Sequence, residues 1–385
     1  YNFEEVVERK NTYSIKYDNV EEIFKEKDLI PLWVADMDFK VPDVIQNELQ
    51  NVLDQGIYAY SLTPDSYYNA FTNWCSKRYQ WKIQKSDLAD FHGLIPALNV
   101  IIKTLTSKGD SIIIQPPVYR PFTSAIENNG RVVVENRLKY NQGKYTIDFD
   151  LFEEQAKMAS MFILCSPHNP VGRVWTKAEL EQLASICLKN KVIIVSDDIH
   201  CDIIFSGNKH IPIASLSEDI SNQCITLMAP GKTFNLQGLQ SAFAITTNTE
   251  YLDKIIGERE VQGFMLNNLF SMVSCKAAYG KGEDWLNALL PYIEANRNFV
   301  IDFFKSNLPV IKPVHSEGTY IMWLDCTATG KSHEELKDIF LHKAKVAVVD
   351  GKFFDKQADG FCRLNIGTPR SILTQALERI QAAFS

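Results

Sequence analysis

From about Ser86 to Leu252, short apolar runs alternate with segments of helical periodicity. The run Val192–Val195 consists of β-branched apolar residues, which is typical of a strand buried on both faces of a parallel sheet. Residues Thr176–Leu188 place their apolar side chains on one helix face and connect two such strands, which predicts a right-handed βαβ unit. The pattern therefore predicts an α/β domain with a mostly parallel sheet and helices on both faces. The expected strands are Ser111–Ile114, Phe162–Cys165, Val192–Val195 and Cys224–Met228.

The two ends of the chain follow different patterns. Residues 1–40 have little regular periodicity, so we expect an extended N-terminal arm. Residues 41–284 contain the strands and helices of the expected large domain. In residues 285–385 a long helix precedes the alternating strand Thr319–Asp325, a helix from His333 and a closing helix. This part predicts a smaller α+β domain.

Composition argues against several kinds of partner. The chain of 385 residues carries 40 basic and 47 acidic side chains, a net charge of −7, without a basic block, so we expect no nucleic-acid partner. No run approaches the about 18 uninterrupted apolar residues of a membrane span, and no signal peptide is visible. We therefore expect a cytoplasmic protein with no membrane partner. The eight cysteines are scattered and the seven histidines form no ligand motif, so we expect reduced thiols and no metal site.

Three different polar residues follow three of the expected strands. Lys232 comes after Cys224–Met228 in a segment with almost no other charge, and a lysine among apolar residues has a lowered pKa and can condense with an aldehyde. Asp197 ends another strand, and Asn169 lies in the Pro-x-x-Pro-x-Gly turn after Phe162–Cys165. Open α/β sheets place ligands at the carboxyl ends of their strands, so we expect these side chains to meet. Lysine, acid and amide together indicate a heteroaromatic aldehyde cofactor, pyridoxal phosphate.

Motifs across the whole chain support this interpretation. They occur in order as Ser166–Gly172, Ser196–His200, Gly231–Asn235 and Arg363–Gly367. This set resembles the fold-type I pyridoxal-phosphate enzymes, in the class I/II aminotransferase superfamily. Val34–Phe39, Glu317–Tyr320 and His200, where many aminotransferases have tyrosine, narrow the resemblance further. They are similar to the MalY/PatB group of cystathionine β-lyases and cysteine–sulfur lyases, which includes cystalysin.

The resemblance implies a role for each residue around the cofactor. Lys232 would hold the aldehyde carbon and, once displaced by substrate, act as general base at the substrate Cα. Asp197 would pair with the pyridine nitrogen, and Asn169 would donate to the phenolate oxygen. Tyr119 would stack on the ring, and His200, which follows Asp197 closely, would approach the same edge.

Only one of the adjacent acids Asp197 and Asp198 can face the ring, because successive strand residues point to opposite faces of a sheet. The family motif assigns this role to Asp197. Arg363 lies in Arg-x-Asn-x-Gly, which matches the family's clamp for the substrate carboxylate and suits the planar guanidinium. The resemblance also implies that Ala35 of the N-terminal arm and Tyr320 contribute to the substrate pocket.

The start of the helix after Gly93 is the expected phosphate site, where the backbone amides of Leu94 and Ile95 would bind the anion. In the family, the tyrosine that matches Tyr60 reaches across a dimer interface to the phosphate held by the other subunit. The resemblance therefore implies an obligate homodimer with a shared active site, in which Tyr60 also borders the substrate.

The sequence departs from the superfamily near Lys232. Ala229 and Gly231 stand where the superfamily commonly has phosphate-binding serines, and Gln240 stands where many aminotransferases have arginine. We therefore expect Thr233 or Gln240 to support the phosphate together with the helix amides.

The resemblance implies a β-lyase that cleaves cystathionine or a related L-cysteine thioether to pyruvate, ammonia and a thiol. An aminotransferase is the alternative, because both reactions begin with loss of the Cα proton. A dicarboxylate aminotransferase would need a second cation, for which Arg120 is the candidate near Tyr119. A third alternative is a MalY-like regulatory protein that keeps the cofactor and binds a transcription factor.

Overall fold

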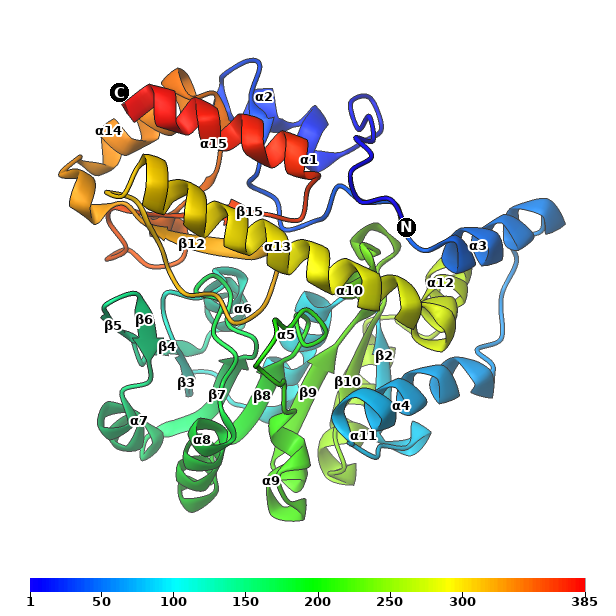
Figure 1. Ribbon diagram of the computed structural model, residues 1–385. Coiled ribbons are helices and arrows are strands. Elements are labelled where there is room, and N and C mark those ends of the chain that lie inside the picture. Colours follow the sequence, from blue (N-terminus) through cyan, green and yellow to red (C-terminus); the bar gives the residue numbers. More distant parts are fainter. Residues whose placement is uncertain (385) are drawn as a thin grey trace.

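The computed structural model describes residues 1–384, and a seven-stranded sheet forms its centre (Figure 1). The strand order is β2-β10-β9-β8-β7-β3-β4. Strand β10 runs antiparallel to both of its neighbours and the other pairs are parallel, which confirms a mostly parallel sheet. The strands are β2 (Leu88–Phe91), β3 (Ser111–Ile114), β4 (Val132–Glu135), β7 (Ala159–Cys165), β8 (Ile193–Asp197), β9 (Cys224–Met228) and β10 (Ala242–Ile245).

Helices cover both faces of this sheet, as the continuous apolar runs predict. Along β7, Phe162 and Leu164 belong to one buried cluster, whereas Met161 and Ile163 belong to the other. Each face is therefore a packed core, and the strand ends are where polar side chains can collect. The helices of this part are α3 (Asp43–Gln55), α4 (Asp65–Tyr79), α5 (Leu94–Leu105), α6 (Pro121–Asn128), α7 (Phe149–Ala156), α8 (Lys177–Asn190), α9 (Glu218–Asn222), α10 (Pro230–Phe234), α11 (Thr249–Val261) and α12 (Leu269–Lys281).

A second, antiparallel sheet of order β11-β12-β15-β14 lies above the first in Figure 1. Its strands are β11 (Lys312–Pro313), β12 (Ile321–Asp325), β14 (Val349–Asp350) and β15 (Phe361–Asn365). The helices around it are α13 (Glu283–Asn307), α14 (His333–Asp338), which continues into a π-helical turn (Ile339–Lys343), and α15 (Arg370–Phe384). The long helix thus begins at Glu283, slightly before the expected start at residue 285.

The N-terminal arm joins the smaller sheet region rather than the large one. Its strand β1 (Ile30–Pro31) pairs in parallel with β13 (Val346–Ala347). Two short helices, α1 (Ile15–Asp18) and α2 (Val20–Phe24), precede this strand. A hairpin of β5 (Lys139–Asn141) and β6 (Lys144–Thr146) completes the strands. The arm therefore runs across the boundary between the two sheets, where the site lies.

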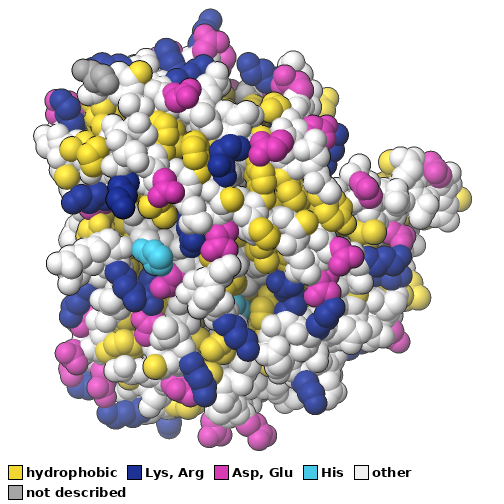
Figure 2. All heavy atoms as spheres, in the orientation of Figure 1, with side chains coloured by type: hydrophobic (Ala, Val, Ile, Leu, Met, Phe, Trp, Pro, Cys, Tyr) yellow, Lys and Arg dark blue, Asp and Glu magenta, His cyan; other side chains and the backbone are white. Residues whose placement is uncertain are grey.

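Helix α3 projects from the body of the molecule, and an extended segment leads from it to α4 (Figure 1). The helix ends at Gly56, whose φ of +69° lies in the left-handed region that favours glycine. The exposed surface mixes acidic and basic side chains over the face shown in Figure 2. Within residues 1–384, no helix is long and apolar enough to cross a membrane, and His, Cys, Asp and Glu form no group suited to a metal ion.

Candidate active site

A cavity of about 760 Å³ opens at the carboxyl ends of β7, β8 and β9, under the smaller sheet and the N-terminal arm. Five predicted residues from separate parts of the chain line it together: Asn169, Asp197, Lys232, Tyr119 and Arg363. The first three follow neighbouring parallel strands, so their meeting results directly from the strand order. Arg363 comes from β15 of the smaller sheet, so this site lies between both parts of the molecule.

Lys232 lies in the short helix α10, which follows β9 and has Pro230 in its first turn. Its Nζ donates a hydrogen bond of 2.6 Å to the carbonyl oxygen of Ala35. Burial lowers the pKa of the amine to about 8, and the charge of Arg363 acts in the same direction, while the carboxylates of Asp36 and Asp197 oppose both. The amine is therefore neutral in a useful fraction of molecules near neutral pH, as condensation with an aldehyde requires.

The two acids at the end of β8 face opposite sides, as the strand geometry predicts. Asp197 lines the cavity, whereas Asp198 accepts hydrogen bonds from Ser196 Oγ and, at 2.8 Å, from His210 Nε2 on the other side. Burial raises the pKa of Asp197 to about 7, although the backbone N–H of Ile199 stabilises its charged form. A cation placed against this carboxylate would hold it ionised, so the position suits a protonated ring nitrogen.

Arg363 is buried, with 6% of its surface exposed, and is only partly bonded. Its guanidinium donates to Asn169 Oδ1 at 3.1 Å and to the carbonyl oxygen of Trp33 at 2.9 Å. Its Nε has no hydrogen-bond partner among the described residues. Burial lowers the pKa of the guanidinium to about 10. A buried cation with a free donor is a ready partner for a carboxylate.

His200 and Tyr119 complete the walls around these groups. His200 is buried, and its Nδ1 is without a partner in the part of the chain that the structure describes. Burial places the pKa of the imidazole well below its usual range, so the ring is neutral, with one nitrogen that donates and one that accepts a hydrogen bond. Tyr119 packs edge-on against Phe122 with ring centroids 5.7 Å apart, and burial raises the pKa of its phenol. Both rings therefore present uncharged faces to a planar ligand.

Leu94 and Ile95 line the other end of the cavity, at the start of α5. Gly93 precedes them with a φ of +150° and has no side chain to cap the helix, so their backbone amides remain available to an anion. Gln240 also lines this end, as predicted, and so does Ser241, which the sequence reading missed. Ser241 Oγ is buried beside the thiol of Cys275.

Thr233 is not brought to the cavity, which corrects the expectation that it supports a phosphate. Its side chain is fully buried, and its Oγ1 donates a hydrogen bond of 2.8 Å to Asp202 Oδ2. The other carboxylate oxygen of Asp202 accepts hydrogen bonds from Trp74 and Tyr79. Thr233 therefore fixes α10 against the loop after β8. This contact positions the neighbouring Lys232 instead of binding a ligand.

Tyr320 and Tyr60 lie outside the residues that line the cavity in the described chain. Tyr320 is fully buried, and its hydroxyl donates 3.0 Å to the carbonyl oxygen of Ala35, so it supports the cavity wall from behind. Tyr60 is 96% exposed in the segment between α3 and α4. Within a single chain it therefore has no contact with the site, and any role in it requires a second subunit.

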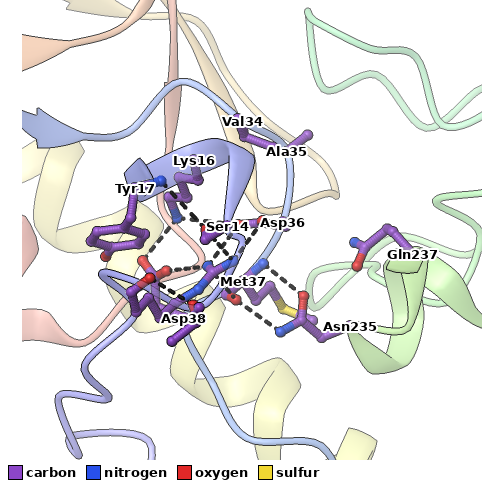
Figure 3. A network of polar contacts seen from close by, with 12 residues as sticks. Ser14, Lys16, Tyr17, Val34, Ala35, Asp36, Met37, Asp38, Asn235 and Gln237 are labelled. Atoms are coloured by element: carbon purple, nitrogen blue, oxygen red, sulfur yellow. Dashed lines mark hydrogen bonds and ion pairs between the residues drawn. The ribbon is translucent and has the colours of Figure 1, made fainter. Parts of the chain in front are cut away.

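A network of buried charges holds the arm residues that border the cavity (Figure 3). Arg9 pairs with Asp36 at 2.9 Å and with Asp38 at 2.6 Å, and the fully buried Lys16 reaches Asp38 at 2.8 Å. Asn235, just after α10, exchanges hydrogen bonds with the backbone of Met37. The network therefore holds the arm directly after Ala35, whose carbonyl receives the Lys232 amine.

A buried amine, a carboxylate and a guanidinium with a free donor around one cavity define an enzyme site for an amino acid and an aldehyde cofactor. Residues 27–380 match the family model described as aminotransferase class I and II. The chain belongs to this family, whose fold it shares.

Individual relatives cover the whole chain. It is 38% identical over 386 aligned residues, which is 100% of both chains, to the cystathionine β-lyase PatB of Bacillus subtilis. Among solved structures, it is similar to a PLP-bound protein from Clostridium difficile 630, with 44% identity, full coverage of both chains and a TM-score of 0.98. It is also similar to cystalysin from Treponema denticola, which contains pyridoxal 5'-phosphate, with 34% identity, a TM-score of 0.96 and coverage of 100% and 98%.

Proposed function

We propose that this protein is a pyridoxal-phosphate-dependent carbon–sulfur β-lyase. It would convert an L-cysteine thioether and water into a thiol, pyruvate and ammonium. The observation that carries the proposal is that Lys232 and the buried Arg363 line one cavity. The full-length likeness to a cystathionine β-lyase then favours elimination among the reactions such a site supports.

The free polar atoms of the cavity fit pyridoxal phosphate. Asp197 would pair with the ring nitrogen, and Asn169 and His200 would contact the polar edge of the ring. Tyr119 would cover its face, and Lys232 would bind the aldehyde carbon. The amides of Leu94 and Ile95 would hold the phosphate with the side chains of Gln240 and Ser241. When bound, this cofactor supplies an electron sink for the negative charge that forms at the substrate Cα.

Side chains of this protein would bind the substrate and transfer the protons. Arg363 would bind the substrate carboxylate through its guanidinium and so fix the Cα–H bond relative to Lys232. The amine of Lys232, with a pKa of about 8, is close to the value that suits proton exchange near neutral pH. It would remove the Cα proton, after which the thiolate leaves from Cβ and takes up a proton.

The position of Arg120 argues against a dicarboxylate aminotransferase. Arg120 is exposed and lies over the ring of Phe353 at 5.4 Å, outside the lining of the cavity. Among residues 1–384, Arg363 is the arginine that lines the cavity, so a distal carboxylate lacks a matching guanidinium within the chain.

A homodimer would complete this site. Several apolar side chains near the projecting α3 are exposed, which favours their burial against a second copy. Exposed Leu266 belongs to the same surface, and its carbonyl oxygen lies 3.3 Å from His92 Nε2 at the phosphate end of the cavity. Tyr60 of one subunit would then reach the phosphate held by the other. The exposed side chains are Leu53, Ile57, Tyr58, Tyr60, Leu62, Met265 and Leu266.

We also place the protein in the cytoplasm. All eight cysteines of the described chain are buried free thiols, which suits a reducing compartment.

Incubation with cystathionine and no added oxo-acid tests the function directly. The purified protein loaded with pyridoxal phosphate should release many equivalents of pyruvate, ammonium and homocysteine per active site. Lys232→Ala serves as the negative control. Conversion that stops after one equivalent per site, without thiol, would replace the lyase by an aminotransferase.

A further inference from the structure

The cavity extends into a second region, here called the apolar chamber. Its walls come from three parts of the chain: α2 with the adjoining arm, α14 with its π-helical turn, and the link between β13 and β14. The apolar chamber is defined by the side chains of Ile23, Phe24, Trp33, Leu336, Phe340 and Val348.

The apolar chamber begins next to the carboxylate-binding candidate. The carbonyl oxygen of Trp33 accepts a hydrogen bond of 2.9 Å from Arg363, and the Trp33 ring packs edge-on against Phe24 with centroids 5.3 Å apart. Val349, the neighbour of Val348, pairs with Arg363 across β14 and β15. A substrate whose carboxylate lies on Arg363 therefore has apolar walls within reach of its side chain.

Charged groups lie only at the outer edge of the apolar chamber in the described chain. There His333 is paired with Asp350 at 3.0 Å, and Lys337 is exposed. A distal ammonium or carboxylate inside the apolar chamber would lose its hydration without gaining a partner, which is costly. An alkyl or aryl group would instead gain from leaving water.

We propose that the apolar chamber binds the group on sulfur of bulky apolar L-cysteine thioethers, in preference to the zwitterionic half of cystathionine. This proposal rests on the proposed β-lyase function and names its substrate class. The reaction stays the same: the Cβ–S bond breaks, the sulfur leaves as thiolate and takes a proton, and water converts the remainder to pyruvate and ammonium.

A homologous series of substrates tests the proposal. The holoenzyme is assayed for pyruvate release with S-methyl-, S-propyl-, S-butyl- and S-hexyl-L-cysteine and with cystathionine. Each added methylene should raise kcat/KM by about two- to fourfold, because each one leaves water for apolar walls. A kcat/KM that stays level or falls with chain length, or that is highest for cystathionine, would overturn the apolar chamber as the binding site and leave the lyase function intact.

A variant at the rim locates the effect. Ile23 is 47% exposed and lines the apolar chamber, so Ile23→Glu should fold normally and place a charge at its wall. It should lower kcat/KM for S-hexyl-L-cysteine by about tenfold and leave S-methyl-L-cysteine nearly unchanged. Leu151→Glu is the matched control, since Leu151 is an exposed aliphatic residue of a helix remote from the cavity. Equal effects of Ile23→Glu on both substrates would contradict the proposal.

Direct binding separates this proposal from the function on which it rests. Calorimetry with 1-hexanethiol should show binding to the holoenzyme that Ile23→Glu weakens about tenfold and Leu151→Glu does not. If no thioether yields pyruvate but hexanethiol binding follows this pattern, the lyase function fails and the apolar chamber stands. Absence of hexanethiol binding would overturn the apolar chamber even if cystathionine is cleaved.

Discussion

The amine of Lys232 lies 2.6 Å from the carbonyl oxygen of Ala35, which is 197 positions earlier in the sequence. The hydroxyl of Tyr320 donates to the same oxygen at 3.0 Å. A backbone oxygen of the N-terminal arm thus fixes the reactive amine, and the arm is itself held by the charge network around Arg9 and Lys16. The arm is therefore part of the machinery that positions Lys232 as well as a border of the pocket.

The titration of Lys232 in cofactor-free protein is the first prediction. Burial lowers the pKa of this amine from its ordinary 10.5 to about 8, so its reaction with acetic anhydride should rise until about pH 8 and then level off. Competitive labelling followed by mass spectrometry measures this rate, and the other lysines in the same sample serve as references. A Lys232 rate that keeps rising to pH 10 would contradict the effect of burial.

The same shift in pKa predicts how stability depends on pH. The unfolded chain binds more protons at Lys232 than the folded chain between about pH 8 and 10.5, so this group makes folding more favourable as pH rises through that range. Lys232→Met should remove this contribution. Denaturant unfolding at pH 7 and pH 10 should therefore show a smaller gain in stability for Lys232→Met than for the unaltered protein.

Replacement of Lys232 tests the assignment of the reactive lysine. Lys232→Ala should lose the visible absorption of bound pyridoxal phosphate and essentially all turnover, because no other amine lies at that place in the described cavity. Lys337 also lines the cavity, but at its exposed outer edge, so Lys337→Ala is the control and should keep both properties. Visible absorption that survives in Lys232→Ala would assign the cofactor to another lysine.

Asp197 and Asp198 should differ in what their replacement affects. Asp197→Asn removes the charge that faces the cavity and should lower kcat/KM by roughly 30- to 1000-fold, which corresponds to about 2–4 kcal/mol. Asp198→Asn should instead lower the free energy of unfolding by about 1–3 kcal/mol, because it disturbs the buried contacts with Ser196 and His210. Steady-state kinetics and urea unfolding measure the two effects. Equal losses of activity would reject the assignment by strand direction.

The sequence predicts those site residues whose positions follow from the local pattern and the order of the strands. Asn169, Asp197 and Lys232 each follow a buried apolar strand, and parallel neighbours bring such ends together. Arg363 required a motif, because β15 belongs to another sheet and no periodicity relates the two. Strand geometry predicted that only one of Asp197 and Asp198 can face the cavity, and the family motif was needed to choose Asp197.

The sequence does not predict the contacts between polar atoms that are far apart along the chain. From the sequence, the hydroxyl of Thr233 could bind either a ligand or another part of the protein. In the structure it donates a hydrogen bond to the buried carboxylate of Asp202. Nothing in the local pattern of Ala35 indicates that its carbonyl receives the Lys232 amine. One feature of the sequence indicates Ser241 as a phosphate contact. It directly follows Gln240, which replaces the expected arginine, so another donor to the phosphate is needed.

Mixed dimers test whether Tyr60 acts across an interface. Tyr60→Phe should weaken pyridoxal-phosphate retention by about 10- to 100-fold, the effect of losing one hydrogen bond to a charged group. Lys232→Ala is inactive in its own site but would offer an intact Tyr60 to its partner. Unfolding and refolding the two variants together should therefore restore one complete site per mixed dimer, measured as pyruvate release at limiting cofactor. Absence of recovery in a verified mixed dimer would place Tyr60 in its own subunit's site or outside any site.

The last prediction concerns the buried charges that hold the arm. Lys16 is fully buried against Asp38, so Lys16→Met leaves a carboxylate with one partner fewer and should lower the free energy of unfolding by about 3–5 kcal/mol. Because the arm positions Ala35, hydrogen exchange should also increase in residues 33–39 before global unfolding. The exposed pair of Lys40 and Glu5 provides the control, since Lys40→Met on the same arm should cost less than about 1 kcal/mol.

A double replacement distinguishes a lost charge pair from general damage to the core. Lys16→Met with Asp38→Leu removes both buried charges and substitutes apolar groups of similar size, which should recover much of the stability lost in Lys16→Met. Arg9 would still hold Asp36, so the arm should remain in place and turnover should recover with it. If the double variant is as unstable as Lys16→Met, packing around Lys16 and not its charge holds the arm. If stability recovers but turnover does not, the carboxylate of Asp38 is needed to set the position of Ala35 against Lys232.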